Sequence, residues 1–523
     1  MTSDVRAGAR KIVSVNPATG QILCELDPAG EPEVRHAVTR ARAAQNPWSG
    51  LDLRRRIALI REFQRRLHAK KSQIAAAITR EEGKPIAEAL TTEVLVVLDA
   101  ARFLIDNARR LLRDEPVPHG NLATRLKRGT LLREPYGVIG IISPWNYPFS
   151  IPATETLAAL LAGNAVVLKP SELTPLVALE LARLLHESGV PKDVFQVLVG
   201  DGATGTTLIQ SSIDKLVFTG SAATGKRIAT AAAECLLPVV LELGGKDPML
   251  ILDDAPIDVA SSAAVWGAFV NAGQACLSVE RCYVHRSLYE AFLHACVEKA
   301  KRLRVGPGDD SETDIGPMIH ERQLRIVEDQ VEDAKARGAR ILLGGSRLPK
   351  LGPNFYAPTI LADATREMRI MREETFGPVL PVAPFDDDDE AVRLANDSEY
   401  GLAASIWTRD GRRGEQLSRR IEAGTVMVND VVSCFGISEA PHGGAKASGL
   451  GRTHGRFGLE EMVRLKYVDV DLTPTIKKVW WYGYGEAFRR QMDGFLDMQF
   501  ARGLGPRLRG VLRAAGVLGR KRL

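Results

Sequence analysis

The chain has 523 residues, of which 45% are hydrophobic and 25% charged, and its formal net charge is +5. Such a length and composition are ordinary for a globular protein with more than one domain. The charge is unevenly placed: residues 477–523 hold eleven Lys and Arg against three Asp and Glu, a net +8 that leaves −3 for the rest and excludes a nucleic-acid-binding body.

The first part of the chain predicts helices. No signal-peptide pattern opens it, and no run of about 18 apolar residues that could span a bilayer occurs in the sequence, so we expect a cytoplasmic protein. Apolar residues such as Ile57, Ile60 and Phe63 recur at helical spacing within residues 53–113. The tripeptide GKP at 83–85 interrupts this pattern before a second long periodic stretch.

Short apolar runs alternate with helix-like segments from about residue 138. The runs GVIGIISPWN, KLVFTGS and VVLELGG each finish in small or polar residues. This alternation predicts a parallel sheet covered by helices on both faces, with ligands at the carboxyl ends of its strands. A second series of strands and helices begins after Pro248, so we predict two α/β domains.

Two glycine-rich stretches resemble phosphate-binding loops. GDGATG at 200–205 fits GxGxxG, but no acidic partner stands out about twenty residues later, which favours a tight turn. GSAATGK at 220–226 begins like a P-loop, yet Arg227 stands where magnesium needs Ser or Thr, so the ATPase interpretation fails. What remains is a helix opening at about Ser221, whose free N–H groups suit a pyrophosphate.

The stretch VNAGQACLSVERCYVH at 270–285 holds two cysteines, Cys276 and Cys282. Either thiol is a buried small hydrophobe, the commoner case, or one of them is a nucleophile. The spacing of Cys and His suits no zinc site, and the acidic run at 385–397 is typical of a solvated loop and helix start. We therefore predict no metal. Six cysteines over the whole chain form no disulfide framework, which favours a reducing compartment.

Several polar residues stand in unusual settings. Asn146 lies between aromatic residues after an apolar strand, and Glu242 ends an otherwise apolar strand before two glycines. A carboxylate there is costly to bury unless paired, which makes Glu242 a candidate general base with a raised pKa. The stretches KPSE (169–172) and EETFGP (373–378) also end strands or pair a carboxylate with a ring. Taken singly, each has a structural explanation: a turn, a salt bridge or a core residue.

The motifs FTGS, LELGGK, GQAC, EETFGP and GGAKASGLGR occur together and in this order. With them the sequence resembles the NAD(P)-dependent aldehyde dehydrogenase superfamily from about residue 12 to about 472. The resemblance implies an α/β fold with a Rossmann-type NAD-binding domain, an α/β catalytic domain, a small β oligomerisation arm and a basic, aromatic C-terminal extension. We assign these to residues 1–122 and 138–246, residues 247–445, residues 123–137 and 460–473, and residues 474–523, respectively.

The resemblance gives Cys276 the nucleophile position. A thiolate attacks an aldehyde readily and is a good leaving group afterwards. The Asn146 amide and the Cys276 backbone N–H would stabilise the oxyanion, and Glu242 would activate water against the thioester. Gly273 and Ala275 would leave room for nicotinamide and substrate beside the thiol.

The resemblance also implies the cofactor site. Gly220, Ser221 and Gly225 would lie near the pyrophosphate, and Glu374 would hold the nicotinamide ribose, with Phe376 against the ring. Lys169 and Glu172 would lie near the adenine-side ribose, GDGATG would flank the adenine pocket, and Trp145 completes the cofactor-binding set. Because a Glu172 carboxylate would repel a 2′-phosphate, we expect NAD to be preferred, with NADP as the other option.

The resemblance also leaves two alternative functions to consider and predicts an assembly. In a CoA-acylating aldehyde dehydrogenase CoA replaces water, and Glu242 argues against it; a non-catalytic scaffold on the same fold is the third option. His442 and Leu277 depart from many relatives near the substrate tunnel, so the aldehyde cannot be copied from one of them. The arm predicts a homodimer or homotetramer, because open strand edges need covering.

The tail, residues 477–523, carries the aromatic cluster at 480–484 and recurring Arg and Lys. One interpretation is an extra helical hairpin that packs on the dimer with solvated arginines. The other is peripheral attachment to an anionic membrane, with Trp480 and Trp481 at the headgroup level.

Overall fold

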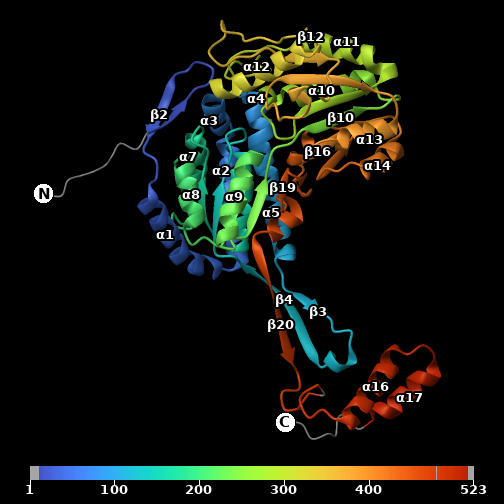
Figure 1. The fold of residues 1–523 in the computed structure, drawn as a ribbon. Coiled ribbons are helices and arrows are strands. Elements are labelled where there is room, and N and C mark those ends of the chain that lie inside the picture. Colours follow the sequence, from blue (N-terminus) through green and yellow to red (C-terminus); the bar gives the residue numbers. More distant parts are fainter. Residues whose placement is uncertain (1–10, 479, 516–523) are drawn as a thin grey trace, which may run out of the picture. The chain divides into compact units, whose positions relative to one another are not determined.

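The structure is a computed structural model and describes residues 11–478 and 480–515 (Figure 1). Its contacts divide the chain into two units. The first comprises Met1–Leu112 and Glu134–Arg464, and the second comprises Arg113–Arg133 and Leu465–Leu523. The first unit contains two large sheets, and the elements around both of them form the candidate site.

The first sheet of this unit has six strands in the order β19-β9-β8-β5-β6-β7. The five strands from β9 to β7 run parallel, and β19 is antiparallel to β9. Their runs of Val, Ile and Leu are buried on both faces, as expected for a parallel sheet. The bounds are β5 (Val138–Ile142), β6 (Ala165–Lys169), β7 (Phe195–Val197), β8 (Lys215–Thr219), β9 (Val239–Glu242) and β19 (Gly449–Leu450).

Helices cover both faces of this sheet (Figure 1). Alternate residues of each strand point to opposite faces, so Ile139 and Ile141 pack with α2, α3, α5, α6 and α7, while Val138 and Ile142 pack with α1, α8 and α9. The bounds are α1 (Glu31–Ser49), α2 (Leu53–Ala69), α3 (Lys71–Glu82), α4 (Ile86–Glu88), α5 (Leu95–Leu111), α6 (Ser150–Ala162), α7 (Pro175–Glu187), α8 (Gly202–Gln210), α9 (Ala222–Glu234) and α15 (Gly455–Glu460).

The helices predicted over residues 53–113 are present as α2, α3 and α5. Asp52 caps α2 by accepting a hydrogen bond from the Arg54 N–H, and Gly83, with φ +98°, ends α3 in the left-handed conformation that glycine tolerates. A π-helical turn, η1 (Ala89–Val94), joins α4 to α5, which the sequence did not predict. Because α3 ends at Glu82 and α4 begins at Ile86, the interruption predicted at GKP (83–85) is confirmed.

The second sheet has seven strands in the order β12-β13-β14-β11-β10-β16-β17, parallel except for β12. Its core is a separate apolar cluster within the same unit, and its first strand, β10, begins at Asp247, next to Pro248, after which the sequence predicts the second series of strands and helices. The strands are β10 (Asp247–Ile251), β11 (Val279–His285), β12 (Arg340–Leu343), β13 (Thr359–Ala362), β14 (Val379–Phe385), β16 (Ala403–Trp407) and β17 (Thr425–Val428). The helices are α10 (Ile257–Phe269), α11 (Tyr289–Ala300), α12 (Glu321–Ala336), α13 (Asp388–Asn396) and α14 (Gly411–Ser418). Short two-stranded ladders are β1 (Ile12–Val15) with β2 (Ile22–Leu26), and β15 (Tyr400–Gly401) with β18 (Ala445–Lys446).

The second unit combines a three-stranded sheet with a helical hairpin. Its sheet has the order β20-β4-β3, from β3 (Glu115–Val117), β4 (Lys127–Pro135) and β20 (Val463–Asp471). The helices α16 (Glu486–Phe500) and α17 (Leu504–Ala514) pack closely at Gly510. The contact has no room for a side chain there, since a Cβ on Gly510 would lie 2.4 Å from the Met498 nitrogen. No helix within the described residues is long and apolar enough to cross a membrane.

Candidate active site

The carboxyl ends of three neighbouring parallel strands meet at one edge of the first sheet. Asn146 follows β5, Gly220 and Ser221 follow β8, and Glu242 is the last residue of β9. Together with Cys276, which precedes β11 of the second sheet, they line a cavity of about 390 Å³. Eight of the residues predicted from the sequence line it: Trp145, Asn146, Gly220, Ser221, Glu242, Cys276, Glu374 and Phe376.

An unusual backbone brings Cys276 to this cavity. Asn271 and Ala272 have φ of +52° and +54°, and Gly273 follows with +72°, so three successive residues are left-handed. A Cβ on Gly273 would lie 2.1 Å from the Gly377 carbonyl oxygen. The sequence assigned Gly273 to free space for ligands; in the structure the backbone of Gly377 fills that space, and glycine is needed for this close approach.

Burial raises the pKa of the Cys276 thiol, and the nearby carboxyl groups of Asp247 and Glu374 raise it further. The thiol is therefore protonated at neutral pH in this state. Cys282 lies on β11 and is fully buried in the apolar core of the second sheet. The two cysteines of this stretch thus have different environments, one in a cavity and one in a core.

Asn146 is held on both sides. Its side-chain amide donates to the Gln274 carbonyl at 3.0 Å, next to the cysteine loop. The backbone carbonyl of Asn146 accepts from the Lys84 ammonium at 2.8 Å and from the Asn271 side-chain amide at 3.0 Å. One amide hydrogen of Asn146 is engaged with Gln274, so the second remains for a ligand in the cavity.

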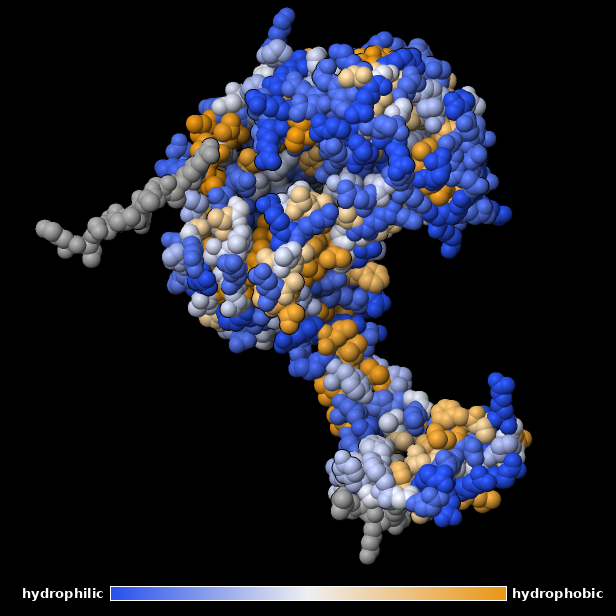
Figure 2. Space-filling model, viewed as in Figure 1, coloured by the Kyte–Doolittle hydropathy of each residue, from blue (hydrophilic) through white to orange (hydrophobic). Residues whose placement is uncertain are grey.

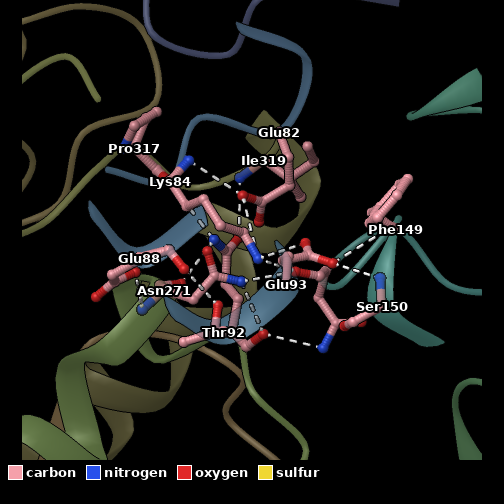
Figure 3. A network of polar contacts seen from close by, with 12 residues as sticks. Glu82, Lys84, Glu88, Thr92, Glu93, Phe149, Ser150, Asn271, Pro317 and Ile319 are labelled. Atoms are coloured by element: carbon pink, nitrogen blue, oxygen red, sulfur yellow. Dashed lines mark hydrogen bonds and ion pairs between the residues drawn. The ribbon is translucent and has the colours of Figure 1, made fainter. Parts of the chain in front are cut away.

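A buried polar network fixes this arrangement from behind (Figure 3). Lys84 also donates to Glu93 at 2.9 Å, and the other Glu93 oxygen accepts from the backbone N–H groups of Phe149 and Ser150. Glu88 accepts from the Asn271 N–H at 2.9 Å. The turn between α3 and α4 therefore holds Asn146 through Lys84, and α4 holds the start of the cysteine loop through Glu88.

Glu242 is buried, and neither of its carboxylate oxygens has a hydrogen-bond partner among the described residues. Burial raises its pKa well above the usual range, and the Glu155 carboxylate adds to this rise. The Nε2 atom of His442 lies 3.8 Å away, but burial lowers the pKa of His442 to about 3, so this imidazole is neutral. An unpartnered, weakly acidic carboxyl beside a thiol is suited to general-base chemistry.

Next to the end of β9, the cavity presents a helix N-terminus, since the Gly220 N–H donates to the Glu242 carbonyl at 3.0 Å. Ser221 caps α9, its hydroxyl accepting from the Thr224 N–H, and the first turn of α9 follows directly. The strand end and helix start predicted around FTGS are confirmed to within a residue. Gly225 does not line the cavity; a Cβ there would lie 2.5 Å from Leu243, so this glycine allows α9 to pack on the end of β9.

Glu374 and Phe376 are held by a buried ion pair. Lys246 contacts Glu280, and the Glu280 carboxylate accepts from the N–H groups of Thr375 and Phe376, both at 2.9 Å. Phe376 has φ +51° and stacks edge-on against Trp145, with ring centroids 5.5 Å apart. Burial and the Glu280 charge raise the pKa of Glu374 to about 8. This carboxyl group therefore offers a proton or an acceptor to a hydroxyl-rich ligand.

Lys169 and Glu172 lie outside the cavity, at the end of the next strand, β6. Their side chains form an ion pair of 3.5 Å, with Lys169 buried and Glu172 half exposed. The Lys169 stem also approaches Gly205 in α8, in the GDGATG stretch. These residues share the sheet edge with the cavity residues, because β5 and β6 are adjacent and parallel.

Sequence analysis did not identify several residues that line the cavity or support its lining. Glu155 and His454 line the cavity, and Glu280 and Lys84 position residues that do. Glu155 is the single charged residue of α6, a helix that is otherwise uncharged and buried, so the argument that found Glu242 applies to it equally. Lys84 and Glu280 act over long sequence distances that spacing does not encode.

The donor set fits a dinucleotide. The N–H groups at the start of α9 suit a pyrophosphate, and the half-buried Glu374 carboxyl, which accepts from the Gly245 N–H, suits a ribose hydroxyl. In comparisons with known proteins, the sequence model of the aldehyde dehydrogenase family matches residues 5–468. The chain belongs to the aldehyde dehydrogenase family.

As an aldehyde dehydrogenase, the protein is an NAD(P)-dependent oxidoreductase that acts on an aldehyde group. It is 39% identical to a 4,4'-diapolycopene aldehyde oxidase of Methylomonas sp, covering 93% of this chain and 91% of that protein. It is also 39% identical to a putative succinate-semialdehyde dehydrogenase [NADP(+)] of Mycolicibacterium smegmatis, over 87% of each.

Solved structures of aldehyde dehydrogenases share this fold. An NAD-dependent enzyme from Sinorhizobium meliloti superposes with TM-score 0.87 at 36% identity, covering 92% of this chain and 95% of that one. The NAD+ complex of an enzyme from Bacillus cereus gives TM-score 0.85 at 35% identity, covering 88% and 94%. The fold predicted from the sequence is therefore confirmed.

Proposed function

We propose that the oxidation proceeds on Cys276, with Asn146 as the oxyanion donor and Glu242 as the general base. The observation that carries this proposal is the unpartnered, buried Glu242 carboxyl in the cavity that Cys276 also lines. A folded protein retains such a costly group where chemistry uses it.

In the first half-reaction the thiol loses its proton to a base in the cavity, and the sulfur bonds to the aldehyde carbon. The oxygen of the resulting tetrahedral carbon becomes an anion, which the free amide hydrogen of Asn146 and the Cys276 N–H stabilise. A nicotinamide held in the cavity would supply the acceptor for the hydride that leaves this carbon. The acyl group then remains on Cys276 as a thioester.

In the second half-reaction Glu242 takes a proton from water, and the water oxygen attacks the thioester carbon. The carbon–sulfur bond breaks, which releases the carboxylic acid and restores the Cys276 sulfur. The raised pKa of Glu242 makes it a stronger base than an exposed carboxylate, once it is ionised.

We propose that the start of α9 holds the pyrophosphate and that Glu374 holds the nicotinamide ribose. Phe376 and Trp145 form a rigid apolar corner on the same side. Lys246 and Glu280 keep this corner in place, because they fix the strained Phe376 backbone. Lys169 and Glu172 serve the adenine-side ribose.

The test is incubation of the purified enzyme with an aldehyde and NAD, followed by absorbance of NADH and quantification of the product. We expect one carboxylic acid per NADH, without added CoA. A product that forms only with CoA, as an acyl-CoA thioester, favours the acylating reaction instead. Absence of NADH with every aldehyde of a broad panel favours a non-catalytic protein.

We predict a preference for NAD over NADP, because Glu172 repels a 2′-phosphate. Glu172→Gln should raise kcat/KM with NADP by about fivefold, the scale of roughly 1 kcal/mol between solvated unit charges about 4 Å apart. Steady-state kinetics with both cofactors measure this. The control Glu180→Gln, on α7, should change neither value. Equal kcat/KM for NAD and NADP in the unaltered enzyme contradicts the role of Glu172.

We propose that the protein assembles through β20. This edge strand exposes Leu465, Tyr467 and Val470, with exposed fractions of 61%, 49% and 38%. Although Arg464, Lys466, Asp469 and Asp471 of this strand are charged, its outer edge and exposed apolar side chains offer a surface that another chain can cover. Multi-angle light scattering at micromolar concentration should therefore give a dimer or tetramer; a monomer refutes this assembly.

We propose, further, that the helical hairpin attaches to anionic membranes. In α17 Leu504, Leu508 and Leu512 recur every four residues and are 80%, 64% and 76% exposed, while the position buried in this helix is Gly510. Figure 2 shows apolar residues of this unit at its surface. Arg507, between these leucines, supplies positive charge beside the apolar face, as in helices that lie in the headgroup region. Residues 479 and 516–523 of the tail lie outside the described residues.

Flotation tests this attachment. We expect the full-length enzyme to float with anionic liposomes at low salt and less so at high salt, because each basic residue near the surface adds about 1 kcal/mol. A form truncated after Pro474, and the variant Leu508→Glu, should remain below. Neutral phosphatidylcholine liposomes are the control. Full-length enzyme that stays in the soluble fraction at low salt shows that the hairpin has a structural role instead.

A further inference from the structure

We propose that this enzyme selects uncharged, apolar aldehydes, which reach Cys276 through a second cavity. This inference rests on the proposed role of Cys276 as nucleophile. The second cavity measures about 200 Å³, and Cys276 lines both it and the cofactor-side cavity. The thiol therefore lies where a polar space and an apolar space meet.

Aromatic and aliphatic side chains form most of the second cavity: Tyr147, Ile151, Trp266, Val270, Leu277 and Phe435. Of the two residues that the sequence placed near the substrate tunnel, Leu277 lines this cavity, whereas His442 lines the cofactor-side one. None of the described residues that line the second cavity carries a charge.

The serine and threonine hydroxyl groups at this cavity already donate elsewhere. Thr91 donates to the Ala87 carbonyl at 2.9 Å, and Thr92 donates to the Glu88 carbonyl at 2.8 Å. Ser433 contacts the carboxylate of Asp430. These three groups thus offer no free donor to an anionic substrate, and Asp430 places a negative charge beside Ser433. The donors that remain in the lining, the Tyr147 hydroxyl and the Trp266 indole N–H, are neutral and cannot balance a buried carboxylate.

A substrate with a second carboxylate would have to bury that charge without a partner, which proteins rarely do. An apolar chain or ring loses no such interaction and gains from leaving water. The volume suits such a group, since an apolar cavity of about 150 Å³ holds a benzene molecule. Two relatives of equal identity carry names of different substrates, a diapolycopene aldehyde and succinate semialdehyde, so identity alone does not choose between them. The uncharged lining of the second cavity favours the apolar aldehyde over the one with a carboxylate.

Hexanal and 6-oxohexanoate make a matched pair, because they share the aldehyde end and chain length and differ in the terminal methyl or carboxylate group. We expect kcat/KM for hexanal to exceed that for 6-oxohexanoate by at least about 100-fold. Thr91→Arg, at the exposed side of the cavity, should raise the ratio of kcat/KM for 6-oxohexanoate to kcat/KM for hexanal at least about tenfold.

The control Thr39→Arg changes an exposed threonine of α1 that makes the same contact to its own helix, since its hydroxyl donates to the Arg35 carbonyl at 2.9 Å. It should alter neither substrate. Equal kcat/KM for hexanal and 6-oxohexanoate, or a preference for the latter, overturns the inference while the proposed chemistry stands. Oxidation of acetaldehyde, but of neither hexanal nor 6-oxohexanoate, also overturns the inference while the proposed chemistry stands. If no aldehyde is oxidised, the proposed function itself fails.

Discussion

Cys276→Ser should abolish aldehyde oxidation, with kcat falling by a factor on the order of 10⁴ or more, because serine at this site lacks a nucleophilic sulfur and the residual rate comes from binding alone. Binding of NAD, measured by calorimetry, should be retained. The change exchanges the sulfur for an oxygen in a loop whose backbone has left-handed residues at Asn271 and Gly273.

Cys282→Ala is the matched control for this result. Cys282 lies six residues further along the same stretch but in the core of the second sheet. Its replacement should lower stability slightly and leave kcat unchanged. If the serine variant of Cys276 turns over normally, or if Cys282 proves essential, the assignment of the nucleophile is wrong.

Glu242→Gln should separate the two half-reactions. We expect a burst of about one NADH per active site, followed by steady turnover reduced by about 10²- to 10⁴-fold, because the acyl group stays on Cys276 without a base to activate water. Rapid mixing with absorbance detection measures the burst, and mass spectrometry of the intact protein measures the added acyl mass. Normal turnover in this variant removes Glu242 from the base role.

The pH dependence gives an independent check. A base works in its deprotonated form, so turnover of the unaltered enzyme should rise with pH through the raised pKa of Glu242. Glu155→Gln removes a carboxyl group that helps to raise the pKa of Glu242. In this variant the rising limb of the pH–turnover profile should therefore move to lower pH, while turnover persists. This variant is also the control for loss of a buried carboxylate, since Glu155 lines the same cavity.

The sequence predicted residues that line the candidate cavity where a single residue contradicts its surroundings. Glu242 was found because a carboxylate ends an apolar strand, and Cys276 was found through its motif. The parallel sheets followed from strand composition, and helix α9 from the loop after β8. Each of these signals is local, because it depends on neighbours within about ten residues.

The sequence could not predict what depends on distant segments. Gly273 is needed because Gly377 approaches it, and Gly225 is needed because Leu243 packs against it. Lys84 reaches Asn146 across 62 positions. The division of space at Cys276 into a polar and an apolar cavity likewise arises from side chains of separate elements. Such contacts require the folded chain.

The contact of Lys246 with Glu280 has a consequence for inheritance. It joins three motifs that are more than thirty residues apart in the gene: LELGGK, the cysteine stretch and EETFGP. A change to either partner alone leaves a buried charge unpaired and costs about 3–5 kcal/mol, a large part of the stability of a typical protein. Descendants of this gene that replace both partners together or keep both avoid this cost, whereas each single-substitution intermediate carries it in the fold around Cys276.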